Sequence, residues 1–362
     1  MKIVLATGIY PPVIGGPATY TKALAEKLAN SGHEITVVTY GEVEKAEKWN
    51  IESVSRSIPI IRWWWYSQKL REVAADADIV YAFSSISCGV PLILSGLKKP
   101  KRVLRLGGDF LWERYTDFGG KKSLRMFYES SFVAGKWMMT RLLNRFDHIV
   151  FSTEFQQSIY KKSYSRLPEN SVIENALSFQ NSKFLIQNSN SPHTPFRLLF
   201  MGRTVQFKNI LSLIDAVAQI PDCFLTIVGE GPQDDMLRKK VEHLGLHTRV
   251  QFSVSVSGTE KRDMFASHDL LVLPSYTDIS PNTALEARAA GLPVLLTKET
   301  GLSSTLLKGM TLAELQRPAD IVSAITHARE SYAAMRSSLK GALEERSWTA
   351  VSEQHEALFA SL

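Results

Sequence analysis

The sequence alternates short apolar runs rich in β-branched residues with segments in which apolar residues recur at helical spacing. Such alternation predicts βα units arranged around parallel sheets. A first helix is expected to begin near Pro17 and to end at Gly32, where a left-handed residue closes a helix. In the first half the runs predict strands over residues 2–7, 34–39, 79–83, 101–106 and 148–152.

The alternation stops once and then restarts. Residues 179–195 are polar, rich in turn formers and without periodicity, which is typical of a linker. The sequence therefore predicts an α/β protein with two doubly wound, Rossmann-like domains, residues 1–178 and 196–345, and a last helix within 346–362. Such sheets bind ligands beyond the carboxyl ends of their strands, and two facing domains would enclose a cleft. Strands of the second half are predicted over residues 197–201, 224–228, 249–252, 270–273 and 293–297.

The composition excludes several protein classes. The chain has 362 residues, of which 44% are hydrophobic and 22% charged, unlike a disordered, collagen-like or coiled-coil protein. Two cysteines cannot build a disulfide framework, so a reducing, cytoplasmic setting is expected. The sequence lacks a secretory signal pattern, and none of its stretches approaches the roughly 20 apolar residues of a membrane span.

The charge is unevenly distributed. Residues 1–178 contain 24 Lys and Arg against 17 Asp and Glu, a net charge of +7. Residues 179–362 contain 18 against 19, a net charge of −1. A basic half indicates an anionic partner, such as a membrane surface, a polyanionic substrate or a nucleic acid, although a merely solvated basic surface fits the same count.

Gly15 and Gly16 lie between the first predicted strand and the first helix. Glycine lets backbone N–H groups approach an anion, and the helix N-terminus adds a favourable dipole. The pair is suited to a phosphate group, but taken alone it also fits a tight strand-to-helix turn.

Gly202 and Arg203 follow the strand predicted over residues 197–201, and Lys208 opens the next predicted helix. An arginine offers a planar fork and a lysine a point charge, so the two cations together suit a diphosphate. Two solvated surface cations are the simpler interpretation of this pair by itself.

Asp278 and Glu286 are separated by seven residues after the strand predicted over 270–273. Asp278 is expected in a loop and Glu286 in the following helix, whose first N–H groups, near Asn282 and Thr283, lack helical partners. One carboxylate could accept hydrogen bonds from the hydroxyls of a sugar and the other from a ribose. Taken alone, two acidic residues also fit an ordinary surface.

Residues 274–294 resemble the signature of the retaining, nucleotide-sugar-dependent glycosyltransferases of family 4, which have the GT-B fold. Asp278 and Glu286 occupy the places of the family's Glu-x7-Glu motif, in which the first carboxylate contacts the transferred sugar and the second the ribose. The resemblance covers nearly the whole chain and implies that the last helix packs on the first domain. Its other elements are the Gly15-Gly16 loop, Ile173-Glu174-Asn175, the diphosphate ligands Arg203 and Lys208, and the turn Gly229-Glu230-Gly231 near the base.

The resemblance implies a hexosyltransferase that moves a sugar, with retention, from a UDP- or GDP-linked donor to a hydroxyl of a glycan or lipid-linked acceptor. The synthesis of cell-surface polysaccharide or glycolipid is the expected context. Neither a metal ion nor a separate cofactor is implied. Catalytic residues would be Arg203, Lys208, Asp278 and Asp109, and donor-binding residues Gly15, Gly16, Gly202, Gly229, Glu230, Ser280, Asn282, Thr283 and Glu286.

The sequence departs from the family pattern at several places. Asp278 is one methylene shorter than the usual glutamate, and Val254 replaces a glycine near the base. Many family members have a histidine after the strand corresponding to residues 101–106. Here Asp109 is the polar group left to orient the sugar or the acceptor, unless it caps a helix. An inverting enzyme with Asp109 as base, and a nucleotide-sugar-binding protein without turnover, therefore stay open.

Residues 62–66 read Arg-Trp-Trp-Trp-Tyr, followed by Lys69 and Arg71, and residues 119–127 and 136–139 repeat the mixture. Tryptophan favours a membrane interface and cations favour anionic lipid, so peripheral contact of the first domain with the inner face of the cytoplasmic membrane is expected. Alternatively, the tryptophans belong to the packed core, or they line an aromatic groove that binds a soluble sugar acceptor. No motif indicates nucleic-acid binding.

Three further features are expected to be structural. Asp76 and Asp78 resemble a metal-binding Asp-x-Asp but precede a strand rather than follow one. His268 is expected to be packed beside the strand over 270–273. Cys88 and Cys223 are expected to be free thiols.

Overall fold

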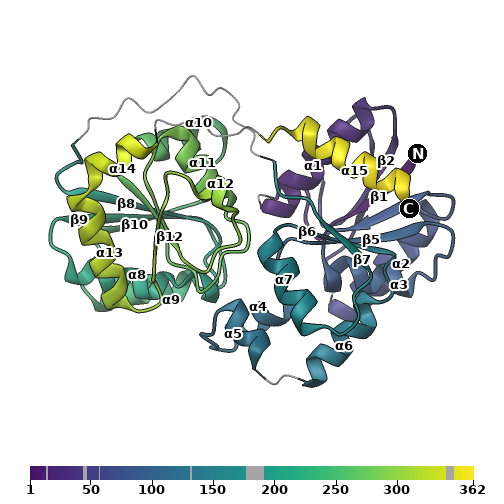
Figure 1. Cartoon of the computed structure of the whole chain (residues 1–362), viewed down its shortest axis with the longest axis horizontal. Coiled ribbons are helices and arrows are strands. Elements are labelled where there is room, and N and C mark those ends of the chain that lie inside the picture. Colours follow the sequence, from purple (N-terminus) through teal and green to yellow (C-terminus); the bar gives the residue numbers. More distant parts are fainter. Residues whose placement is uncertain (14, 44–46, 57, 131–132, 177–190, 340–345) are drawn as a thin grey trace. The chain divides into compact units, whose positions relative to one another are not determined.

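The structure, a computed structural model, describes residues 1–13, 15–43, 47–56, 58–130, 133–176, 191–339 and 346–362. The described residues divide into two units, each built on its own parallel sheet (Figure 1). Within the described ranges, the first unit comprises Met1–Leu111, Tyr128–Ser178 and Arg346–Leu362, and the second comprises Trp112–Phe127 and Phe179–Glu345.

The sheet of the first unit has the strand order β3-β2-β1-β4-β5-β6-β7, and all neighbours are parallel. Five of its strands agree with the predicted ones within a residue at each end. The two that the sequence did not predict, β3 and β7, are edge strands with polar residues that no apolar run reveals. The strands are β1 (Lys2–Ala6), β2 (Glu34–Tyr40), β3 (Asn50–Val54), β4 (Ile79–Ala82), β5 (Lys101–Leu106), β6 (His148–Phe151) and β7 (Glu169–Val172).

Helices cover both faces of this sheet because the strand order reverses at β1. On one face, Ile3 and Leu5 of β1 pack with Leu24 of α1 and with Val351 and Phe359 of α15. The helices that involve this unit are α1 (Gly16–Asn30), α2 (Pro59–Val73), α3 (Val90–Leu94), α4 (Phe110–Asp117), α5 (Leu124–Glu129), α6 (Val133–Leu143), α7 (Glu154–Ser163) and α15 (Trp348–Ser361).

The last helix, α15, lies beside α1 in the first unit, as expected (Figure 1). Its His355 is fully buried, with Nδ1 2.7 Å from the carbonyl oxygen of Val351 and Nε2 3.1 Å from the hydroxyl of Tyr81. Burial lowers the pKa of His355 to about 3, so the ring is neutral and accepts the tyrosine proton at Nε2. The helix is therefore attached to the sheet by a polar bond as well as by apolar packing.

The sheet of the second unit has the parallel order β10-β9-β8-β11-β12-β13. Only β13, a three-residue edge strand, lacks a predicted counterpart. The strands are β8 (Phe196–Met201), β9 (Cys223–Val228), β10 (Val250–Ser253), β11 (Leu270–Leu273), β12 (Val294–Thr297) and β13 (Thr311–Ala313). The helices are α8 (Ile210–Gln219), α9 (Asp234–His243), α10 (Gly258–Ala266), α11 (Asn282–Ala290), α12 (Ser304–Leu307), α13 (Pro318–Glu330) and α14 (Tyr332–Ser338).

The segment 112–127 groups with the second unit, whereas the sequence placed it in the first domain. The amide of Leu124 donates to the hydroxyl of Thr277 at 2.8 Å, and the ring of Trp112 lies 5.0 Å from that of Phe207. Contacts between residues so far apart in the chain leave no trace in a sequence pattern. Most of the expected linker, residues 177–190, lies outside the described residues.

Candidate functional site

The carboxyl edge of the second sheet gathers most of the predicted donor-binding residues. The loops after β8, β9, β11 and β12 are among those that leave this edge. Because parallel strands end at the same edge, residues far apart in the sequence become neighbours there. The loops contain Gly202, Arg203, Lys208, Gly229, Glu230, Asp278 and Ser280, and α11, which follows the third loop, begins at Asn282.

Lys208 and Asp278 form an ion pair at this edge, with Nζ 2.7 Å from Oδ2. The hydroxyl of Ser275 donates to the same carboxylate oxygen at 3.1 Å. Asp278 is 6% exposed, so the pair is shielded from water on most sides. The sequence assigned these two residues to the diphosphate and the sugar, and the structure brings their side chains together.

The backbone of Asp278 is attached to the loop after β12. Its amide donates to the carbonyl oxygen of Glu299 at 2.9 Å, and its own carbonyl oxygen accepts from the amide of Gly301 at 3.0 Å and from the hydroxyl of Thr300 at 3.1 Å. Three bonds hold the residue, so the position of the carboxylate is set by the sheet rather than by a free loop.

Lys208 ends a 3-10 turn, Gln206–Lys208, rather than opening a helix as predicted. Asn209 follows in the left-handed conformation, with φ 57°, and its side-chain amide donates to the carbonyl oxygen of Leu315 at 2.9 Å. The orientation of Lys208 is therefore set by this turn and not by α8, which begins at Ile210. The ring of Phe207, which contacts Trp112, lies 5.4 Å from the Lys208 ammonium group.

The turns after β8 and β9 lie directly against each other. Gly229 has φ 135°, and a Cβ at this position would lie 2.0 Å from the carbonyl oxygen of Gly202. A Cβ at Gly231 would lie 2.6 Å from the carbonyl oxygen of Thr204. Both glycines are therefore required by close approach of the backbone. Arg203 and Glu230 stand exposed on these two turns.

Glu286 lies on α11 and forms an ion pair with Lys261 of α10, at 2.5 Å between Nζ and Oε2. The side chains are 25% and 45% exposed for the lysine and the glutamate, so solvent reaches the pair. The sequence indicated Glu286 but not Lys261, because a partner 25 positions away on another helix has no local signature. Ser280, Asn282 and Thr283, at the start of the same helix, are half-buried.

Gly15 and Gly16 belong to the first unit, where α1 begins at Gly16. A Cβ added at Gly16 would meet no described atom within 4 Å, so the backbone at this helix end is open. The N–H groups of the first turn of α1 have no helical partner. This helix end could therefore receive an anion, as the sequence predicts.

Asp109 is buried in the first unit, with 1% exposure. Its Oδ2 accepts hydrogen bonds from the hydroxyls of Tyr128 and Tyr160, both at 2.7 Å. Burial, together with the nearby carboxylate, raises the pKa of both tyrosines well above the ordinary value, so both remain hydroxyl donors. These contacts weigh against transfer of a proton from an acceptor to Asp109, which directly precedes α4 at the position of a helix cap.

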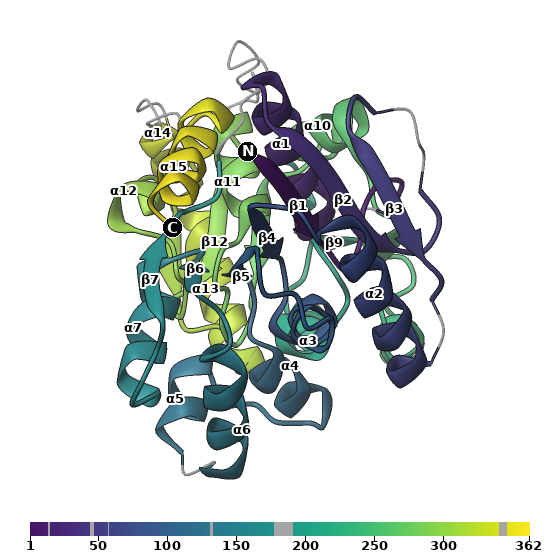
Figure 2. The ribbon, with the colours of Figure 1, turned by 90° about the vertical axis from the view of Figure 1, so that its right-hand side faces the viewer.

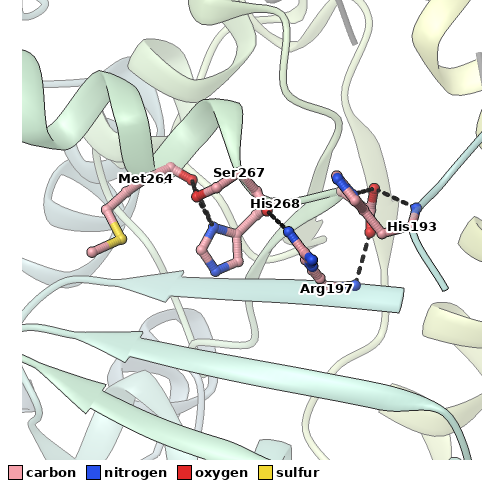
Figure 3. A network of polar contacts seen from close by, with 6 residues as sticks. His193, Arg197, Met264, Ser267 and His268 are labelled. Atoms are coloured by element: carbon pink, nitrogen blue, oxygen red, sulfur yellow. Dashed lines mark hydrogen bonds and ion pairs between the residues drawn. The ribbon is translucent and has the colours of Figure 1, made fainter. Parts of the chain in front are cut away.

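Figure 3 shows a polar network at the opposite, amino edge of the second sheet. The Nδ1 of His268 lies 2.6 Å from the carbonyl oxygen of Met264, and Nε2 lies 2.8 Å from the hydroxyl of Thr226. Both ring nitrogens are occupied and burial lowers the pKa of His268, which supports the expected packing role. In the same network the Oδ1 of Asp269 lies 2.8 Å from Nδ1 of His193 and so fixes the chain as it enters β8 (Figure 3).

The remaining sequence features behave as structural elements. Asp78 accepts from the backbone amide of Lys2 at 2.8 Å, and Asp76 pairs with the Lys2 side chain, at the amino edge of the first sheet. Cys88 and Cys223 are free and buried. In the part of the chain that the structure describes, no three His, Cys, Asp or Glu side chains gather as metal ligands. Within the same ranges, no helix has the length and apolar character needed to cross a membrane.

The chain matches two families of known proteins, one in each half. Residues 14–178 match Glycosyltransferase Family 4, and residues 181–341 match Glycosyl transferases group 1. The uncharacterized glycosyltransferase MJ1607 of Methanocaldococcus jannaschii is 28% identical to this chain over an alignment of 334 positions, which covers 83% of this chain and 82% of the relative.

Solved structures share the fold over the full length of the chain. Sucrose-phosphate synthase from Thermosynechococcus elongatus superposes with a TM-score of 0.76 at 18% identity, covering 99% of this chain and 98% of that one. HepE from Anabaena superposes with a TM-score of 0.75 at 18% identity, covering 100% of both chains. With two parallel-sheet units and a family match in each half, this chain is a group 1 glycosyltransferase with the GT-B fold.

Proposed function

We propose that this glycosyltransferase moves a sugar, with retention at the anomeric carbon, from a nucleoside-diphosphate sugar to a hydroxyl of a glycan or lipid-linked acceptor. The synthesis of cell-surface polysaccharide or glycolipid, at the inner face of the cytoplasmic membrane, is the proposed context. The observation that carries the proposal is the Lys208–Asp278 pair, 2.7 Å between charged atoms, beside the two glycine turns at the carboxyl edge of the second sheet.

The bond that breaks joins the anomeric carbon to the β-phosphate oxygen, and its electron pair leaves with the diphosphate. Arg203 and Lys208, both of the second unit, would stabilise the growing negative charge. Fixed donors aimed at developing charge are an effective source of transition-state stabilisation. This assignment needs no metal ion.

The new bond joins the anomeric carbon to the acceptor oxygen, and the departing phosphate oxygen accepts the acceptor's proton. Asp278 and Ser280 would hold the sugar hydroxyls, while Glu286, Asn282 and Thr283 would hold the nucleotide. In the structure the Lys208 charge is neutralised by Asp278. A bound diphosphate would share that lysine, which leaves the carboxylate available to the sugar.

A second candidate is an inverting transferase with Asp109 as base. The burial of Asp109 and its two tyrosine donors weigh against it, because a base must be reached by the acceptor hydroxyl. A third candidate binds the nucleotide sugar without turnover. Proton NMR of the anomeric configuration of the product separates the first two, and any transfer or donor hydrolysis excludes the third.

The donor can be identified by a thermal-shift screen of nucleoside-diphosphate sugars. The structure of Anabaena HepE contains UDP-glucose, so UDP-sugars are the first group to test and GDP-sugars the second. A ligand that binds only the folded state raises the unfolding midpoint by mass action. If none of these sugars shifts the midpoint, or if the variant Arg203→Ala/Lys208→Ala transfers sugar normally, the proposed site is wrong.

A further inference from the structure

The first two turns of α2 expose large apolar side chains. Within eight residues, the exposed fractions are 66% for Ile58, 79% for Ile60, 45% for Ile61 and 53% for both Trp64 and Trp65. We call these five residues the α2 tip. A surface helix ordinarily carries polar residues on its outward face, so an exposed apolar cluster of this kind marks an interaction surface.

The α2 tip is exposed although the helix itself is packed firmly against the first unit. Tyr66, Leu70 and Ala74, on the inward side, are all fully buried. The Tyr66 hydroxyl lies 2.7 Å from the carbonyl oxygen of Val38, which ties α2 to β2. The helix also packs against α3 (Figure 2). Since another face of α2 already covers the sheet, the tip needs a partner outside the unit.

The charges near the tip indicate an anionic partner. Between Ser53 and Arg71 the sequence contains four cations and no acidic residue. Lys69 is neutralised by Glu52 and Glu72, at 3.4 Å and 2.9 Å, but Arg56 and Arg71 are exposed. The four cations are Arg56, Arg62, Lys69 and Arg71.

The exposed apolar residues lie in the first half of α2, with Arg56 just before them, Arg62 among them, and Lys69 and Arg71 in the second half of the helix. The outward positions from Ile58 to Trp65 are apolar, whereas those from Gln68 to Glu72 are polar or charged. The two exposed tryptophans lie between the isoleucines and these polar residues, and their rings contact edge to face with 4.6 Å between centroids. At a planar interface between hydrocarbon and headgroups, aliphatic side chains enter the hydrocarbon boundary, while tryptophans and the heads of arginines remain at the level of the headgroups.

We propose that the α2 tip docks on an anionic lipid bilayer. The isoleucines and tryptophans of the tip would enter the headgroup boundary, and Arg56 and Arg71 would contact lipid phosphates. Only the purpose of this docking, to bring the enzyme to a lipid-linked acceptor, rests on the proposed function. The docking would use two exposed cations of the basic first half, Arg56 before the start of α2 and Arg71 in its last turn.

The test is flotation of the whole protein with vesicles of phosphatidylcholine and phosphatidylglycerol in equal parts, and with phosphatidylcholine alone. We expect binding to the anionic vesicles that weakens as salt rises from about 0.05 M to about 0.5 M. The variant Trp64→Ser/Trp65→Ser should bind them on the order of tenfold more weakly, because two interfacial side chains are lost. The variant Arg56→Gln should bind about fivefold more weakly, since one cation near the surface is removed.

The matched control is Met236→Ser on α9, which removes a side chain of similar exposure, 54%, from the second unit. It should bind vesicles as the wild type does. A second variant, Trp137→Ser on α6, tests the other exposed tryptophan of the first unit, 57% exposed. Loss of binding in Trp137→Ser but not in Trp64→Ser/Trp65→Ser would overturn the assignment to α2.

Three further results would contradict the proposal: no binding of the wild type, equal binding to neutral vesicles, or full binding by the double tryptophan variant. A wild-type dimer that becomes monomeric in the double variant, seen by sedimentation velocity, would assign the tip to a second copy instead. Donor binding by thermal shift should be unchanged in the double variant. The result of vesicle flotation is thus independent of the result of the donor-binding measurement.

Discussion

The Nζ of Lys208 lies 2.7 Å from Oδ2 of Asp278, although 70 positions separate the two residues in the sequence. One comes from the loop after β8 and the other from the loop after β11, and these strands are neighbours in the sheet. The pair therefore exists because of strand order. In the proposed reaction it is also the place where the diphosphate and the transferred sugar meet.

Lys208→Ala is expected to lower kcat about 10²-fold, with a smaller effect on the KM for the donor. The reason is that the lysine interacts most strongly with the negative charge that grows on the diphosphate in the transition state. Steady-state kinetics with the donor found in the screen measures both constants. Lys239→Ala, which removes an exposed lysine from α9, should leave both constants unchanged; a normal kcat in Lys208→Ala would refute the assignment.

Lys261→Met is expected to raise the KM for the donor several-fold while kcat changes little. Lys261 holds the carboxylate that is proposed to bind the ribose, so its loss releases Glu286 from one orientation. The pair is partly exposed, and its coupling energy should be about 0.5–1 kcal/mol. A double-mutant cycle with Glu286→Gln, read in donor binding, measures that energy. Additive effects of the two substitutions would show that Lys261 acts independently of Glu286.

Gly229→Ala is expected to destabilise the second unit by about 1–3 kcal/mol or more and to weaken donor binding. The new methyl group would overlap the carbonyl oxygen of Gly202, so the turns after β8 and β9 must separate. Gly245→Ala is the control, because Gly245 also has a positive φ, 64°, but a Cβ there meets nothing within 4 Å. It should cost only about 1 kcal/mol of strain and leave donor binding intact. Equal effects in the two variants would mean that the turn contact is unimportant.

Lowering the pH from neutral should destabilise the first unit through His355. The pKa of this histidine is about 3 in the folded chain, below its ordinary value of 6.5. The unfolded state therefore binds the additional proton first. The stability that the neutral ring provides is complete above pH 6.5 and falls by about 1.4 kcal/mol per pH unit between 6.5 and 3.

The variant His355→Phe should lose this part of the pH dependence. Its free energy of unfolding, measured in urea at several pH values between neutral and about 5, should depend less steeply on pH than that of the wild type. The difference in slope should correspond to the uptake of nearly one proton on unfolding. The substitution also removes the bonds to Tyr81 and Val351, so its stability at neutral pH should be lower. Parallel pH profiles for the two proteins would mean that His355 does not titrate on unfolding.

The sequence alone was sufficient for the interior strands and for the loops that carry the proposed donor site. The run Leu270–Leu273 and the polar loop after it are local features, and the structure places both as predicted. The edge strands β3, β7 and β13 were not predicted, because an edge strand needs no continuous apolar run. The position of Asp278 and Glu286 after this run likewise predicted a loop for the first and a helix for the second, as the structure shows.

Tertiary structure decided what the local pattern does not contain. The sequence identified Lys208, Asp278 and Glu286 separately, but the Lys208–Asp278 pair and the Lys261 partner of Glu286 depend on which loops and helices become neighbours. The sequence also showed a run of tryptophans and cations, but only the structure places this run on a helix and decides which of its side chains face the sheet and which face outward. Local composition and the periodicity of apolar residues determine where helices and strands form, because both act over a few neighbouring residues. Contacts between distant elements depend on strand order and packing, which only the folded chain establishes.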